Sequence, residues 1–155
     1  MRACVVWVAG LLIAAAAAVH AVGTDEDAGS ALDPDVAAGK QAIEAKQWPV
    51  AIKVLSAAAL RDTRNADIQN WLGYAYRNAG QLAKAFEHYE RALKLNPRHR
   101  GAHEYVGEAW LIAGRPDEAE KHLEALRSIC LVPCEELDEL KEKVERYRSE
   151  RGPKP

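Results

Sequence analysis

Two cysteines four residues apart, Cys130 and Cys134, carry the most evident chemical potential in this chain of 155 residues. Two thiols at such a spacing can close a disulfide, hold a metal ion or exchange electrons with another thiol pair. Three residues separate them, whereas thioredoxin-like redox motifs have two, and no β-α-β pattern surrounds them. Which chemistry applies depends on the compartment, because disulfides persist mainly in exported proteins.

The histidines offer a second possible chemistry, metal binding. His99 and His103 lie four residues apart, whereas His88 and His122 are far apart in the sequence. A metal site needs ligands that converge and a surrounding shell of groups that orient them. We expect His88 and His122 on the outer surface of the fold and His99 in a turn. The histidines are therefore predicted to be solvated rather than to bind a metal.

The first 21 residues have the features of a secretory signal peptide. Arg2 precedes a long apolar run over residues 3–19, and the small residues Val19 and Ala21 frame a cleavage site after Ala21. An uncleaved membrane anchor is the alternative, because the run is close to the twenty residues that span a bilayer. In both cases Arg2 stays inside and the rest of the chain is exported. We expect a bacterial periplasm or a comparable space.

Composition limits the remaining classes of function. The chain has 21 Lys and Arg against 23 Asp and Glu, and losing Arg2 with residues 1–21 leaves a net charge of −3. A nucleic-acid-binding protein would instead show a basic stripe, so we expect no nucleic-acid partner. The sequence contains no nucleophile motif, no glycine-rich phosphate loop and no pair of carboxylates on one predicted helix face that we interpret as catalytic. We therefore expect neither catalysis nor a cofactor.

One folded domain is expected over residues 34–150. Residues 22–33 are acidic and poor in large apolar side chains, which predicts a flexible leader. Residues 151–155 are predicted to form a disordered tail. Within the domain Gly39, Gly73 and Gly107 are equally spaced, and two sets of alanines share the same period of about 34 residues. This period is typical of helix-turn-helix units that stack into a solenoid, with units over residues 32–65, 66–99 and 100–133.

The middle unit resembles a tetratricopeptide repeat. Its residues in the positions of the family pattern are Leu72, Gly73, Tyr76, Gly80, Ala85, Tyr89, Ala92 and Pro97. The third unit matches with Val106, Gly107, Trp110, Gly114, Ala119 and Leu123. The first unit departs most, with Lys46 at the turn glycine and Thr63 at the closing proline, as terminal repeats often do. The resemblance implies an all-α solenoid of three tetratricopeptide repeats.

A capping helix is predicted over residues 135–149. Leu137, Leu140, Val144 and Tyr147 recur at helical spacing and form one apolar stripe, while the other faces are charged. Such a helix covers the open end of a solenoid. A disulfide between Cys130 and Cys134 would tie it to the last repeat; a redox or metal-binding pair and two free buried thiols are the alternatives.

The resemblance also implies a partner-binding groove, because in this family the first helices of the repeats line the concave face. Matched by position in the repeat, the groove residues are Lys40, Asn70, Tyr74, Arg77, Asn78, Glu104 and Glu108. The glutamates favour a basic partner. The set of bases that some family members use to hold a C-terminal carboxylate is incomplete. Replacing Tyr74 and Arg77 together by alanine is expected to abolish partner capture with little effect on stability.

The expected function is therefore that of an exported scaffold that binds an unidentified protein or peptide, as an adaptor in the assembly of an envelope complex. Contact with a membrane is expected only if the N-terminal segment is not cleaved. The alternative is a thiol-redox or metal-handling accessory protein that uses Cys130 and Cys134.

Overall fold

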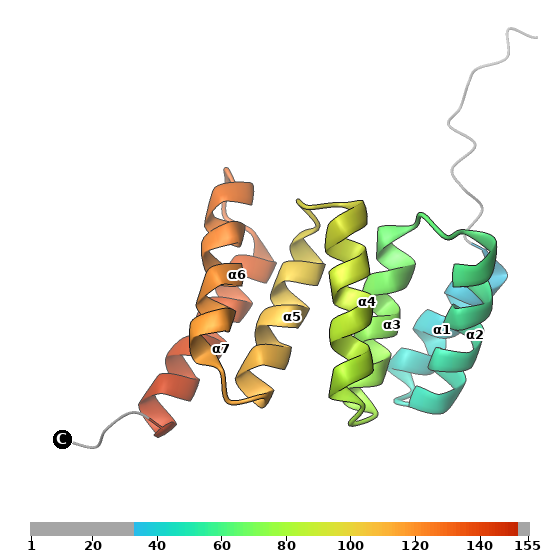
Figure 1. Ribbon diagram of the computed structural model, residues 1–155, viewed down its shortest axis with the longest axis horizontal. Helices are drawn as coiled ribbons and strands as arrows, with labels where there is room; N and C mark the ends of the chain where they lie inside the picture. Colours follow the sequence, from blue (N-terminus) through green and yellow to red (C-terminus); the bar gives the residue numbers. More distant parts are fainter. Residues whose placement is uncertain (1–32, 152–155) are drawn as a thin grey trace, which may run out of the picture. The chain divides into compact units, whose positions relative to one another are not determined.

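The computed structural model describes residues 33–151, which form seven helices and no strand (Figure 1). The helices are α1 (Pro34–Glu44), α2 (Trp48–Arg61), α3 (Ala66–Asn78), α4 (Leu82–Leu95), α5 (Arg100–Ile112), α6 (Pro116–Ile129) and α7 (Glu135–Arg151). The predicted all-α solenoid is confirmed. Arg151, assigned to the tail from the sequence, is instead the last residue of α7. The predicted signal peptide, and the leader except Asp33, lie outside the described residues.

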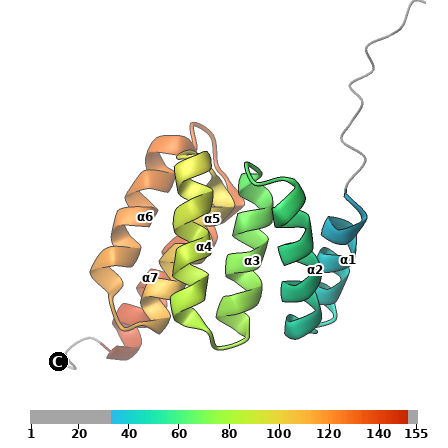
Figure 2. The same cartoon turned by 45° about the vertical axis from the view of Figure 1, so that its right-hand side comes forward.

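The helices stack as successive pairs. The first helix of each pair packs against its own second helix, and α3 and α5 also contact one another (Figures 1 and 2). Helix α7 packs against both α5 and α6. Within residues 33–151, no helix combines the length and the apolar character that crossing a membrane requires.

Glycines let the helices of a pair approach closely. A Cβ atom added to Gly73 would lie 2.5 Å from Cε1 of Tyr89, and one added to Gly39 would lie 2.5 Å from Cγ of Leu55. Tyr89 and Leu55 are fully buried. The regular recurrence of glycine therefore marks helix crossings that a larger side chain would overpack.

Helix α7 continues the repeat register. Leu72, Val106 and Leu140 are equally spaced along the chain, one repeat period apart, and all three are buried. Gly107 faces Leu140, whose Cδ2 would lie 2.6 Å from an added Cβ. The capping helix thus occupies the position of the first helix in a further repeat, and it covers the apolar surface of α5 and α6.

The turns inside the pairs need a left-handed residue. Gly80 and Gly114 have φ of 75°, and Lys46 takes the corresponding place in the first pair with φ of 55°. A side chain at positive φ is strained by contact of Cβ with the backbone. Lys46, which replaces the turn glycine of the family pattern in the first repeat, is therefore held in a strained backbone conformation.

Replacing Lys46 with glycine is expected to raise the free energy of unfolding by about 0.5–1 kcal/mol, because the relief of strain exceeds the greater freedom of glycine in the unfolded chain. Urea denaturation of the two proteins measures the change. The converse substitution, Gly80→Ala, serves as the comparison and is expected to destabilise by about 1 kcal/mol. Equal stability of Lys46→Gly and the parent would contradict the prediction.

Candidate functional site

A groove of about 450 Å³ lies between α3, α5 and α7. Five of the seven residues assigned to the groove from the sequence line it: Asn70, Tyr74, Arg77, Glu104 and Glu108. A somewhat larger hollow of about 540 Å³ lies beside α2 and α4 and has a mainly apolar lining. The groove differs from this hollow because it gathers charged, amide and aromatic side chains at one place.

Arg77 lies at the centre of the groove wall. Its side chain is only 7% exposed and forms an ion pair with Glu108. The guanidinium carbon lies 5.1 Å from the ring centre of Tyr74 and 5.4 Å from that of Tyr105, and the group also donates to the carbonyl oxygen of Tyr105 at 3.3 Å. Such stacking and hydrogen bonding fix a long side chain in one position. Arg77 is thus a structural part of the groove as well as part of its surface.

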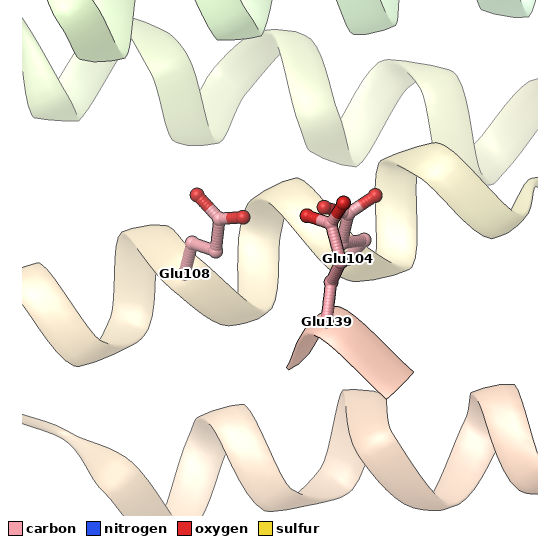
Figure 3. Close-up of side chains that lie close together, drawn as sticks. All are labelled: Glu104, Glu108 and Glu139. Atoms are coloured by element: carbon pink, nitrogen blue, oxygen red, sulfur yellow. The ribbon is translucent and has the colours of Figure 1, made fainter. Parts of the chain in front are cut away.

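Lys143 reaches the same network from α7. Its ammonium group pairs with Glu108, lies 2.8 Å from Glu139 and lies 3.5 Å from Glu104. Figure 3 shows the three glutamates converging from α5 and α7. Their oxygens lie within 4.8 Å of one another, as in a metal site. Two cationic side chains already contact these carboxylates, so the arrangement is better described as an ion-pair network.

Glu104 holds a proton more firmly than an ordinary carboxyl group. Burial, and then the charge of Glu108, raise the pKa of Glu104 to about 8. The pKa of Glu139 is lowered, first by its hydrogen bond with Lys143. At neutral pH a protonated Glu104 can therefore donate to an ionised Glu139.

Asn70 brings an unsatisfied acceptor to the groove. The residue is 3% exposed, and its Oδ1 has no hydrogen-bond partner within residues 33–151. A buried polar atom without a partner costs roughly 1–3 kcal/mol, so such atoms are rare and call for an explanation. A ligand that donates to this oxygen would provide one.

The other two predicted groove residues lie elsewhere. Lys40 lies on α1 with its ammonium 5.2 Å from the ring centre of Trp71. Asn78 is exposed at the end of α3 and donates to the carbonyl oxygen of Tyr74 at 2.8 Å. The groove also contains residues that were not predicted, among them Trp71, Tyr105, Glu139 and Lys143. Of these, only the two aromatic residues lie in repeats whose pattern could have indicated them.

The prediction that the histidines are solvated is wrong for His103, which lies inside the repeats. His103 is buried, its Nε2 lies 3.0 Å from the carbonyl oxygen of Pro97, and its Nδ1 lies 3.0 Å from Nδ1 of His122. Because a carbonyl only accepts, Nε2 of His103 donates, and a neutral pair then requires His122 to donate from Nδ1. Gln69 and His88 form the equivalent contact at 2.9 Å, one repeat earlier in the chain.

Burial favours uncharged imidazoles here, and for His103 it outweighs the hydrogen bond to the Pro97 carbonyl, which favours the protonated ring. Burial lowers the pKa of His103, and burial together with His103 lowers the pKa of His122 to about 4. Below the ordinary histidine pKa of about 6.5, the unfolded chain binds protons that the folded chain does not. Stability is therefore expected to fall as the pH falls from 7 towards 4.

The variant His122→Asn is expected to weaken this pH dependence, because an amide can keep the hydrogen bond without titrating. In the parent protein, the free energy of unfolding is expected to drop by about 1–3 kcal/mol between pH 7 and pH 4 on account of this pair. Denaturation curves at several pH values compare the two slopes. If both proteins lose stability equally, the imidazole pair does not titrate as described.

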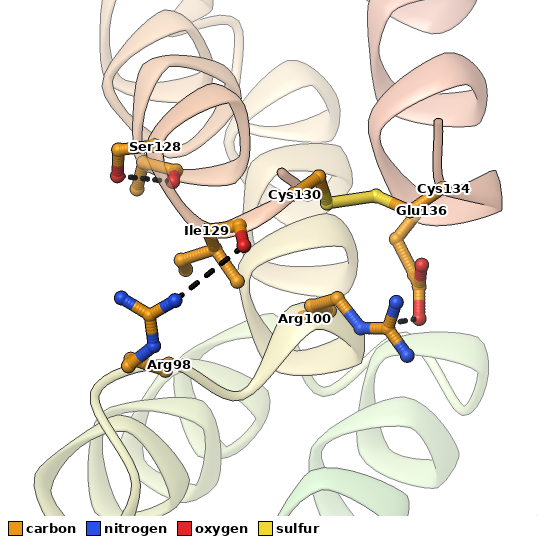
Figure 4. The surroundings of a disulfide bond; sticks show 8 residues. Arg98, Arg100, Ser128, Ile129, Cys130, Cys134 and Glu136 are labelled. Atoms are coloured by element: carbon orange, nitrogen blue, oxygen red, sulfur yellow. Dashed lines mark hydrogen bonds and ion pairs between the residues drawn. A yellow bond between two sulfur atoms is a disulfide. The ribbon is translucent and has the colours of Figure 1, made fainter. Parts of the chain in front are cut away.

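The two cysteines lie between α6 and α7. Their sulfur atoms are 1.99 Å apart and their Cα atoms 6.0 Å apart, the arrangement of a disulfide (Figure 4). Beside it, Arg98 donates to the carbonyl oxygen of Ile129, and Arg100 lies 3.5 Å from Glu136. Cys134 is 8% exposed, which restricts access of a thiol-exchange partner to its sulfur.

Two tetratricopeptide repeat family models match the chain, over residues 66–99 and 87–129. The chain is a tetratricopeptide repeat protein. No curated protein matches its sequence. Solved tetratricopeptide repeat domains have the same fold.

Three solved structures illustrate the likeness. The tetratricopeptide repeat domain of Sgt2 from Aspergillus fumigatus is 22% identical, with a TM-score of 0.69 over 79% of this chain and 83% of that one. The TPR2B domain of yeast Sti1, solved as a complex with pHsp70, is 17% identical, with a TM-score of 0.70 over 76% and 96%. The translocator chaperone SycD of Yersinia enterocolitica is 20% identical, with a TM-score of 0.68 over 77% and 85%.

Proposed function

We propose that this tetratricopeptide repeat protein is a scaffold that binds an extended segment of a partner protein in the groove between α3, α5 and α7. The observation that carries the proposal is the groove itself, which is lined by the aromatic side chains of Trp71, Tyr74 and Tyr105 together with Asn70, whose buried Oδ1 lacks a donor within residues 33–151. Aromatic groups with few rotatable bonds are the side chains that most often dominate binding energy. Concave surfaces of stacked repeats are the usual binding surfaces of solenoids.

The structural relatives support a peptide or protein as the ligand. The yeast Sti1 domain was solved with pHsp70, and SycD is a chaperone of a type III secretion translocator. In this chain six carboxylates and two permanent cations line the groove. A segment that ends in a carboxylate would be repelled there, so we do not extend carboxylate recognition to this protein.

Site-specific photo-crosslinking in the native cells tests the proposal. A photoreactive amino acid at position 74 lies in the groove, while one at position 60, where Leu60 is 82% exposed on α2, lies outside it. We expect position 74 to yield a defined crosslinked partner that position 60 does not. Identical products from both positions, or none from position 74, would contradict binding in the groove.

We also propose that the protein works in an exported compartment as an adaptor in envelope assembly. The support is the signal-like sequence of residues 1–21 and the pairing geometry of Cys130 and Cys134. Intact mass of the protein isolated from its native compartment tests this. A chain that lacks residues 1–21 and two hydrogens is expected; a full-length chain with free thiols would refute cleavage and oxidation.

Removing the disulfide by Cys130→Ala with Cys134→Ala is expected to lower the free energy of unfolding by about 2 kcal/mol. The bond closes a short loop, so the constraint on the unfolded chain is modest. Urea denaturation with and without reductant measures the effect, and the reduced parent serves as the control because its stability should match the double variant. A parent unaffected by reduction would contradict the prediction.

A further inference from the structure

We propose that the bound segment carries a lysine or arginine side chain that sits against Glu104 and Glu139, while one of its backbone N–H groups donates to Oδ1 of Asn70. This inference rests on the groove being the peptide site proposed above. It adds the chemical class of the residue that the groove selects.

The groove has fewer positive than negative charges. Glu104, Glu108 and Glu139 converge, and Arg77 and Lys143 are the two cations that contact them. Asp67, Glu135 and Glu136 add further negative charge to the lining. A network of three carboxylates and two fixed cations is complementary to one more cation, which a ligand can bring.

The network already accommodates an ammonium group. Nζ of Lys143 lies 2.8 Å from Glu139 and 3.5 Å from Glu104, while its main partner is Glu108. Within residues 33–151, the longer contact with Lys143 is the one ion pair that Glu104 forms. The side chain of Glu104 is nevertheless only 7% exposed. A ligand cation on the groove side of Glu104 would complete the coordination of this carboxylate.

Aromatic and amide side chains lie in the same groove as the carboxylates. Tyr74 and Tyr105 have their ring centres 4.9 Å apart, and the ring centre of Trp71 lies 6.2 Å from that of Tyr74. Aromatic faces attract cations, as the position of Arg77 against two of them shows. Asn70, which is among the lining residues, is 3% exposed, and its Oδ1 is an acceptor that lacks a donor within residues 33–151. A peptide supplies both a side-chain cation and a backbone donor, whereas a bare metal ion supplies only charge.

The network also provides a measurable signature. The raised pKa of Glu104 keeps its carboxyl group protonated near neutral pH, so a proton neutralises the charge that a ligand cation would otherwise balance. A cationic ligand is expected to displace that proton. The titratable and charged groups near Glu104 are Tyr105 and Glu108 on α5, Glu139 and Lys143 on α7, and Arg77 on α3; Asp67, Glu135, Glu136 and His99 also line the groove.

A displayed library of short random peptides, selected on the immobilised protein, is the probe. We expect peptides rich in lysine or arginine from the parent. We expect this enrichment to be lost with Glu104→Gln or with Glu139→Gln. Glu139 is more exposed than Glu104, so we expect its substitution to leave the fold intact. Glu150→Gln, at an exposed position of α7 outside this groove, is the matched control and should select the same peptides as the parent.

A selected peptide is then synthesised with its basic residue or with citrulline in that place, and calorimetry is run in buffers of different ionisation heat. We expect citrulline to weaken binding about tenfold or more, and the basic peptide to release protons from the parent but not from Glu104→Gln.

The outcomes separate the two proposals. The variant Tyr74→Ala shows whether a peptide binds in the groove. Peptides that depend on Tyr74 but lack basic residues, or that tolerate citrulline, would overturn this inference and leave the scaffold function standing. Selection of no peptide that depends on Tyr74 would overturn both. Basic peptides that bind both glutamine variants as well as the parent would show that their basic residue binds outside the groove. That result would also refute the inference.

Discussion

Replacing Gly73 with alanine is expected to lower the free energy of unfolding by about 2–3 kcal/mol. The new Cβ would lie 2.5 Å from Cε1 of Tyr89, whose side chain is fully buried, so the ring or the helix must shift to admit it. Alanine usually stabilises a helix by about 1 kcal/mol relative to glycine, but overpacking a buried ring outweighs that gain. Chemical denaturation measures the loss.

Gly101→Ala is the matched control on the next first helix. Its Cβ would meet its nearest neighbour, Nδ2 of Asn70, at 3.3 Å, so the neighbour needs to shift by only a few tenths of an ångström. We expect this variant to stay within about 1 kcal/mol of the parent. Equal effects of the two substitutions would mean that the helix crossing at Gly73 is not the tight contact described.

Replacing Arg77 with alanine is expected to cost about 3 kcal/mol of stability and to abolish partner capture. The substitution leaves Glu108, whose side chain is 16% exposed, with Lys143 as its one remaining cation. Removing one partner of a buried ion pair is strongly destabilising because the other charge stays buried. The sequence predicted that replacing Tyr74 and Arg77 together has little effect on stability. Because Arg77 forms a buried ion pair, we now expect that double substitution to be destabilising.

A double-variant comparison separates charge from packing. Arg77→Met with Glu108→Gln removes both charges, and it should recover part of the loss seen with Arg77→Ala. Arg127→Ala is the exposed control, since Arg127 pairs with Glu124 at 2.9 Å on the surface of α6 and should cost less than about 1 kcal/mol. If Arg77→Ala is as mild as Arg127→Ala, the ion pair does not contribute as proposed.

The architecture could be predicted because it follows from a period. Equally spaced glycines place helix crossings at regular intervals, and the repeat pattern then orients Asn70, Tyr74 and Arg77 towards the groove. The same period could have revealed the histidine contacts. Gln69 and His103 are one repeat period apart, as are their partners His88 and His122, so one polar contact recurs in two repeats.

The charge network could not be predicted in the same way. Lys143 and Glu139 come from α7, which follows the irregular segment between the cysteines, and its charged faces indicated only a solvated cap. Positions in a repeat pattern say which way a side chain points within its own unit. They do not say which charges a neighbouring helix brings against it, because that depends on how deeply the helix docks and how it is rotated.

The register of α7 has a consequence for how such a binding surface can change. Since Leu140 stands where Leu72 and Val106 stand, the end of the stack and each internal junction present the same kind of surface. Duplicating residues 66–99 within the gene would insert a module compatible with both neighbours. Recombination could therefore lengthen the binding groove by one repeat at a time. The capping helix α7 and its acidic network would be retained in the longer protein.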